Sequence, residues 1–183
     1  MVYIQKKKDI LWGGATASSQ YEGGYDLDGK GLDTQDCRPY LKRTSDATTA
    51  TRLLTQEVID EAKKCQGVGN YPFRKGSDGY HHIDEDIALL NELGIDIYRF
   101  SISWARLYPQ GDELEPNKEG IAFYDHIFKE VHKAGMKIFL TMNHYAVPLY
   151  LVENYGGWTN RKLVTFYERF AKTVFEHWGQ YID

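Results

Sequence analysis

The chain has 183 residues, of which 42% are hydrophobic and 14% aromatic, and its formal net charge is −4. This apolar content excludes a wholly disordered chain, and the acidic balance argues against a nucleic-acid partner. No apolar run approaches the ~20 residues of a membrane-spanning helix, so no membrane partner is expected. Cys37 and Cys65 form no CxxC pair, and no signal peptide is visible. We therefore expect a cytoplasmic protein with reduced thiols and no metal site.

The first predicted strand is the apolar run at residues 10–12, which leads through small residues to Gln20 and Glu22. A long irregular stretch follows, at about residues 23–77. Within it, residues 46–64 have weak helical character and residues 67–72 read as a turn. Because this stretch exceeds ordinary connection lengths, it predicts a functional loop or a partly mobile insertion.

Helical spacing becomes clear at residues 80–93, where apolar side chains recur every three or four positions and Gly94 supplies the stop. The acidic residues 84–86 are expected in the first turn of this helix, where the helix dipole favours them. A second buried strand is predicted at residues 95–101.

The same order then repeats. A helix is predicted at residues 118–134, ended by Gly135, and a third buried strand at residues 136–142. The next helix is expected to begin near Thr159 or Asn160, which can cap its amide groups, and to end before Gly179.

Alternating strands and helices imply an α/β protein with a parallel sheet and right-handed crossovers. An open doubly wound sheet and a barrel both satisfy this pattern. No GxGxxG or phosphate loop follows the first strand, which argues against a nucleotide cofactor.

Polar side chains follow or end each predicted strand: Gln20 after the first, Arg99 late in the second, and His144 and Tyr145 after the third. The carboxyl ends of parallel strands meet at one edge, where a (β/α) barrel builds its active site. On residue type alone, each also has a structural interpretation. Gln20 can bond nearby backbone, His144 can be a satisfied structural group, Tyr145 can pack, and Arg99 can form an interior salt bridge.

Four tracts in order resemble signature tracts of the family 1 glycoside hydrolases. They are WGGATASSQYEGG (residues 12–24), YRFSISWARLYP (98–109), FLTMNHYAVPLYL (139–151) and GGWTNRKLVTFYERFA (156–171). The resemblance covers nearly the whole chain except about residues 37–76, for which no family pattern is evident.

The resemblance implies a (β/α)8 TIM barrel that hydrolyses β-glycosides with retention, using one glutamate after strand four and another after strand seven. Neither tract occurs in this sequence. The chain is therefore expected to be the amino-terminal portion of a single barrel domain, about three β/α units over residues 1–183, with the insertion at about 23–77. No cofactor and no metal are implied.

The resemblance also implies roles for individual residues. Gln20 would hydrogen-bond the hydroxyls of the glycone, and His144 would contact the same sugar. Tyr145 stands where the family places an aromatic ring along the sugar. Arg99 would lie beside the nucleophile and hold that carboxylate ionised. Glu22 is expected to be structural.

DGKGL (residues 28–32) together with HYAVP (144–148) resembles the bacterial 6-phospho-β-glucosidase branch. Ala146 departs from the family pattern, in which an acidic residue often stands there, and the DTQD tract (33–36) lacks the aromatic that many plain β-glucosidases carry. Both departures bear on aglycone preference. The expected partner is a small-molecule β-glycoside. The alternatives are a plain β-glucosidase, or a non-catalytic fragment that binds sugar weakly. Because three strands leave open edges, such a fragment would self-associate or pair with a complementing carboxyl-terminal half.

Overall fold

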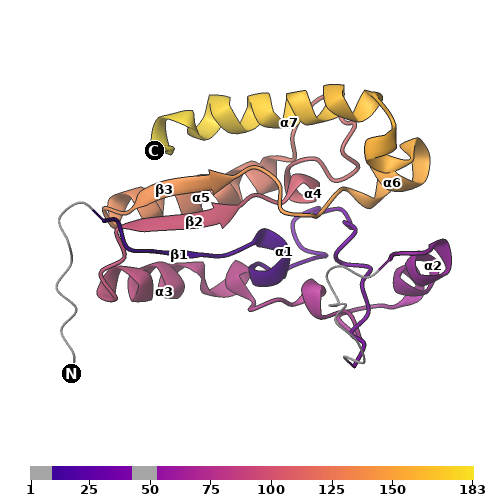
Figure 1. The fold of residues 1–183 in the computed structure, drawn as a ribbon, viewed down its shortest axis with the longest axis horizontal. Coiled ribbons are helices and arrows are strands. Elements are labelled where there is room, and N and C mark those ends of the chain that lie inside the picture. Colours follow the sequence, from indigo (N-terminus) through magenta and orange to yellow (C-terminus); the bar gives the residue numbers. More distant parts are fainter. Residues whose placement is uncertain (1–9, 43–52) are drawn as a thin grey trace.

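Three parallel strands form one sheet in chain order, and the predicted parallel sheet is thereby confirmed (Figure 1). The computed structural model describes residues 10–42 and 53–183. The strands are β1 (Gly13–Ala15), β2 (Ile97–Ser101) and β3 (Lys137–Thr141). β2 lies in the middle and pairs with both neighbours.

Long helices make the connections between the strands. α3 (Gly79–Glu92) leads from β1 to β2, α5 (Lys118–Lys133) leads from β2 to β3, and α7 (Lys162–Trp178) follows β3. Figure 1 shows α3 and α7 on either side of the sheet and α5 behind it. Each strand–helix–strand unit is the crossover that the alternating pattern predicted.

Shorter elements fill the segments between the strands and these helices. They are α1 (Ser18–Tyr21), α2 (Gln56–Lys64), η2 (Pro72–Arg74), α4 (Trp104–Leu107), α6 (Leu149–Tyr155), η3 (Gly157–Thr159) and η4 (Gly179–Tyr181).

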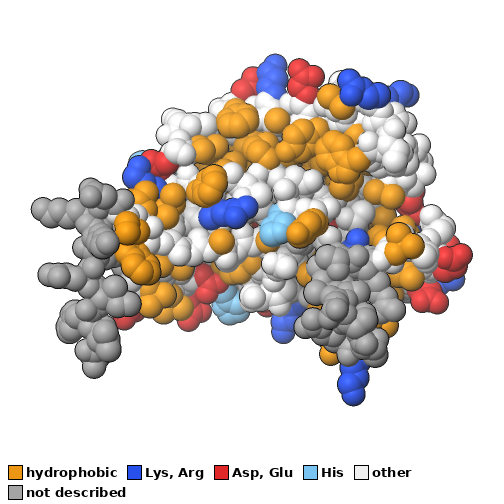
Figure 2. Space-filling view, in the orientation of Figure 1, with side chains coloured by type: hydrophobic (Ala, Val, Ile, Leu, Met, Phe, Trp, Pro, Cys, Tyr) orange, Lys and Arg blue, Asp and Glu red, His pale blue; other side chains and the backbone are white. Residues whose placement is uncertain are grey.

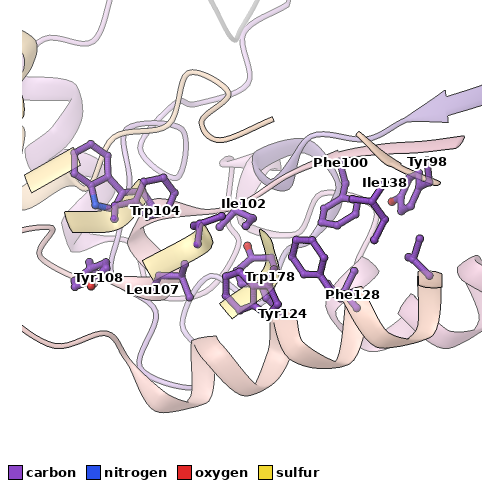
Figure 3. Packing of buried hydrophobic residues seen from close by; sticks show 14 of the residues in the cluster. Tyr98, Phe100, Ile102, Trp104, Leu107, Tyr108, Tyr124, Phe128, Ile138 and Trp178 are labelled. Atoms are coloured by element: carbon purple, nitrogen blue, oxygen red, sulfur yellow. The ribbon is translucent and has the colours of Figure 1, made fainter. Parts of the chain in front are cut away.

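One face of the sheet is buried against the helices. Tyr98 and Phe100 of β2 and Ile138 of β3 alternate with outward-facing neighbours, and they join a cluster with Phe128 of α5 and Trp178 of α7 (Figure 3). The rings of Phe128 and Trp178 stack with centroids 5.1 Å apart. Burying a large apolar side chain contributes about 1.5–3 kcal/mol, so this cluster holds the helices to the sheet.

The opposite face of the sheet is open. Ala15, Arg99 and Phe139 lie in register across the three strands, and Phe139 is 54% exposed. Figure 2 shows hydrophobic side chains gathered over the sheet and along α7 on this side of the molecule. The chain therefore presents an apolar surface of the kind that monomers usually cover.

The first strand lies later than the sequence predicted. Residues 10–12 are exposed and not in a strand, and β1 is made from the small residues that follow them. A side-chain carbon at Gly13 would lie 2.3 Å from the Ile97 carbonyl oxygen, so only glycine permits this approach of β1 to β2. The apolar run was therefore the wrong signal for this strand.

Two helix starts also differ from the prediction. α3 begins at Gly79, so the acidic residues 84–86 lie beyond its first turn, and no acidic residue lies in that turn. α7 begins at Lys162, and Thr159 belongs to the preceding short helix η3. Asn160 still caps the start, since its Oδ1 accepts a hydrogen bond from the Lys162 amide at 3.0 Å.

The stretch at 23–77 contains more order than an irregular loop. α2 covers the second part of the weak helix predicted at 46–64, and residues 46–52 lie outside the described residues. Ile59 and Ala62 of α2 pack with Cys37, Tyr71 and Leu149 in a second, smaller apolar cluster. This cluster ties the stretch to α6, which follows β3.

Candidate functional site

Arg99 lies on the open face of β2. Its Nε donates a hydrogen bond of 2.8 Å to Oγ1 of Thr141, the last residue of β3, and its guanidinium carbon lies 5.5 Å from the centroid of the Phe139 ring. Within the part of the chain that the structure describes, no carboxylate forms an ion pair with it. The interior salt bridge that sequence alone allowed is therefore absent from the described residues.

Gln20 lies in α1, directly after β1, and is exposed. Among residues 10–42 and 53–183 its side chain has no hydrogen-bond partner. The backbone-bonded loop amide, which residue type alone allowed, is not what the structure shows. The amide offers two donors and an acceptor to a ligand.

His144 and Tyr145 follow β3 at the same end of the sheet as α1 (Figure 1). Their ring centroids lie 4.6 Å apart. Tyr145 is 64% exposed and has a φ of 67°, a conformation that costs a residue with a side chain about 1–3 kcal/mol. Packing does not explain why Tyr145 keeps a strained backbone while its ring is exposed. Residues with strained backbones concentrate at functional sites.

The segments after β1 and β3 are joined beside this site. Thr34 N donates to the Val147 carbonyl at 3.0 Å, and Val147 N donates to Thr34 Oγ1 at 3.2 Å. Leu149 N donates to the Leu32 carbonyl at 2.8 Å. The DTQD tract, whose function the sequence left open, is therefore hydrogen-bonded to the segment that carries His144.

A buried cluster of charged side chains lies within and just before the DTQD tract. Lys30 Nζ lies 2.6 Å from an Asp36 carboxylate oxygen and 3.4 Å from one of Asp33. Burial raises the pKa of Asp36 to about 6; Asp33 adds to the rise, and Lys30 opposes it. Burial lowers the pKa of Lys30, but the two carboxylates outweigh that effect and raise it, so the ammonium stays charged.

Glu22 is structural, as the sequence favoured. Its carboxylate is buried, 3.2 Å from Arg106 Nε, and accepts a 2.6 Å hydrogen bond from the Tyr124 hydroxyl. Burial raises the pKa of Tyr124 well above its usual value and Glu22 adds to the rise, so the phenol keeps its proton and donates it. Glu153, the other glutamate near the site segments, pairs with Lys63 at 2.9 Å. Both carboxylates are therefore engaged in ion pairs with residues of this chain.

Arg106 and Tyr124 were not singled out from the sequence. Glu22 and Arg106 are 84 positions apart, and no local pattern joins residues at that separation. The available signal was that Arg106 is the single charged residue in the largely apolar segment 102–109, directly after the second strand.

No cluster of three or more histidine, cysteine, aspartate or glutamate side chains within the described part of the chain is arranged to hold a metal ion. No helix within it is long and apolar enough to cross a membrane.

A parallel strand–helix sheet with polar side chains at its carboxyl end is the arrangement expected of part of a (β/α) barrel. The sequence model described as Glycosyl hydrolase family 1 matches residues 3–183, and the chain belongs to that family. The family resemblance and the barrel fold class, rather than a doubly wound sheet, are thereby confirmed.

Similar proteins are named for phosphorylated β-glucosides. "Phospho-cellobiase" of Klebsiella oxytoca is 44% identical over 92% of this chain and 33% of its own length. "Aryl-phospho-beta-D-glucosidase BglH" of Bacillus subtilis is 44% identical over 92% of this chain and 32% of its own length. The chain thus spans about a third of the curated relatives it matches.

Solved structures agree on the fold. A β-glucosidase from Exiguobacterium marinum has a TM-score of 0.76 at 30% identity, with 98% of this chain and 35% of that chain covered. A β-glucosidase from Thermotoga maritima, in complex with a substituted glucoimidazole, has a TM-score of 0.75 at 28% identity, with 97% of this chain and 35% of that chain covered.

Proposed function

We propose that this chain is the glycone-contacting, amino-terminal portion of a retaining glycosidase that cleaves 6-phospho-β-glucosides in the cytoplasm. One observation carries the choice of substrate. Relatives named for phospho-β-glucosides are 40–44% identical to the chain, whereas relatives named for unphosphorylated glucosides, from Triticum aestivum and Arabidopsis thaliana, are 35% and 34% identical. A plain β-glucosidase is the alternative that this difference disfavours.

Sugar contact is assigned to three exposed or half-buried side chains. The amide of Gln20 suits neighbouring hydroxyls, because it both donates and accepts hydrogen bonds. The Tyr145 ring offers an apolar face to a sugar, and His144 lies against it with ring centroids 4.6 Å apart. Support for this role is that Gln20 and Tyr145 are exposed at the carboxyl end of the sheet.

The catalytic carboxylates are proposed to come from polypeptide outside this chain. Retaining hydrolysis needs two carboxyl groups about 5 Å apart across the sugar. Glu22 is held by Arg106 and Glu153 is held by Lys63, so they do not provide such a pair. Arg99 lacks a carboxylate partner among the described residues and would orient the incoming nucleophile.

A second candidate is a non-catalytic sugar-binding fragment that associates with itself. The open face of the sheet favours it, since Phe139 is exposed there. Within the described residues the outer edge of β1 has no strand partner, and the outer edge of β3 is bonded only at Ile138, by Asp183. Pairing with a complementing carboxyl-terminal half would cover the same surfaces.

Complementation separates the two candidates. The chain would be co-expressed with the carboxyl-terminal two-thirds of Bacillus subtilis BglH and assayed with 4-nitrophenyl 6-phospho-β-D-glucoside and its unphosphorylated counterpart. We expect turnover of the phosphorylated substrate only when both parts are present, and its loss on Gln20→Ala. A stable, folded assembly without turnover would favour the non-catalytic fragment, and preference for the unphosphorylated glucoside would favour a plain β-glucosidase.

A further inference from the structure

The backbone that carries Gln20 sets the point from which its amide extends, and the side chain itself has no partner among the described residues. That backbone is α1, a helix of four residues. One helical turn is unstable on its own, so contacts with the rest of the molecule must hold it. At its start, Ser18 N donates to Ser101 Oγ, at the end of β2, at 2.7 Å.

Glu22 fixes the other end of α1. Its amide donates to the Ser18 carbonyl at 2.9 Å, and its carboxylate is held by Arg106 and Tyr124. Arg106 Nη2 also donates to the Gly23 carbonyl at 3.0 Å. A single arginine therefore binds both the side chain and the backbone that end this turn.

Arg106 and Tyr124 are themselves held in place. The Arg106 guanidinium carbon lies beside the stacked rings of Tyr80 and Phe123, 4.9 Å and 4.8 Å from their centroids. The Tyr124 hydroxyl accepts a 2.7 Å hydrogen bond from the Ser103 amide while it donates to Glu22. A buried network with most of its groups bonded favours one geometry and is costly to break.

We propose that Arg106 and Tyr124 are positioning residues for Gln20. Acting through the Glu22 carboxylate, they fix the turn from which the Gln20 amide reaches the sugar. This inference rests on the proposed sugar-binding role of Gln20, but the order of α1 can be tested without any sugar.

The first test compares two buried tyrosines. Tyr124→Phe removes the hydroxyl that holds Glu22, whereas Tyr108→Phe removes a hydroxyl that bonds Thr173 of α7 at 2.7 Å. Amide hydrogen exchange would be measured for Ser18 and Glu22, together with the mobility of the Gln20 side-chain amide by ¹⁵N relaxation. We expect Tyr124→Phe to speed exchange at both amides roughly tenfold and to mobilise the Gln20 amide, because a hydrogen bond to a charged group is lost. Tyr108→Phe should leave both unchanged. Equal effects of the two variants would overturn the proposal.

The second test asks whether Tyr124 acts through Gln20. Glucose 6-phosphate would be titrated into the chain, the two single variants Tyr124→Phe and Gln20→Ala, and the double variant. We expect Tyr124→Phe to raise the Kd several-fold in the parent chain and to have no further effect beside Gln20→Ala. The same increase in both backgrounds would contradict positioning. If the chain binds no glucose 6-phosphate, the sugar-binding role fails, and the exchange comparison alone decides the positioning role.

Discussion

Asp36 is a buried carboxyl whose ionisation affects folding stability. Burial raises its pKa from the usual 3.8 to about 6. Between these two values the folded chain binds more protons than the unfolded chain, so this group's contribution to stability falls as the pH rises, by at most about 3 kcal/mol. Asp36→Asn should remove that slope. Urea unfolding of both proteins between pH 4 and pH 7 measures it as the difference between their free energies of unfolding.

Asp78 provides a control of the opposite sign. It is partly exposed, and its hydrogen bond with His81 lowers the pKa of its carboxyl. Stability from this group is present above the usual pKa and is lost as the pH falls. Asp78→Asn should therefore lower stability at neutral pH and not in strong acid. For each variant, the difference in free energy of unfolding from the parent chain would be plotted against pH. The same sign of slope for Asp36→Asn and Asp78→Asn would contradict the arrangement of charges described above.

We predict that Tyr145 lowers the stability of the folded chain and strengthens ligand binding. Its φ of 67° suits glycine, so Tyr145→Gly should raise the free energy of unfolding by about 1 kcal/mol, while Tyr145→Ala keeps the strain and should not. Both variants lose the ring and should bind glucose 6-phosphate more weakly. Chemical denaturation and a binding titration on each variant check the two effects, and equal stability of the two variants would count against strain at this residue.

Among the elements, α5 ends where Gly135 adopts a left-handed backbone conformation. Gly135 follows it with a φ of 77°, and a side-chain carbon there would meet nothing within 4 Å. A substitution therefore costs backbone strain alone. Gly135→Val should destabilise the chain by about 1–2 kcal/mol, whereas Gly135→Asn should cost much less, because asparagine tolerates the left-handed region. Melting temperatures of the two variants provide the measurement, and an unchanged value for Gly135→Val would refute this helix boundary.

Helices with a clear apolar face, α3 and α5, were predictable from the sequence to within a residue. α5 is the clearest case, since its buried side chains recur at helical spacing and Gly135 marks its end. β1 was not predictable, because three small residues carry no apolar pattern and their position depends on close approach to Ile97. In the candidate site, the position of Gln20, His144 and Tyr145 after the ends of strands was predictable from the sequence. The pairing of Glu22 with Arg106 was not, because it depends on contacts between distant segments.

At the scale of the whole molecule, the open face of the sheet makes the role of Arg99 depend on what covers it. In the chain alone, Arg99 is exposed and bonds only Thr141 among the described side chains. Exposed substitutions usually change stability by less than about 0.5 kcal/mol, so Arg99→Met should leave the unfolding of the isolated chain unchanged. In the complemented assembly the same change should lower kcat at least roughly a hundredfold, because the nucleophile would lose the charge that orients it.

Lys137→Met is the matched control for Arg99→Met. Lys137 is also exposed on the sheet, but it lies at the opposite end of β3, where it pairs with Asp183 at 2.8 Å. Removing its charge should change the stability of the isolated chain by less than about 0.5 kcal/mol, because exposed ion pairs contribute little. It should leave kcat of the assembly unchanged. Unfolding of the chain and single-substrate kinetics of the assembly would be measured for both variants. Equal kcat losses would show that Arg99 has no special relation to the catalytic carboxylate, and a large stability loss in isolated Arg99→Met would show that this arginine already has its structural partner within the chain.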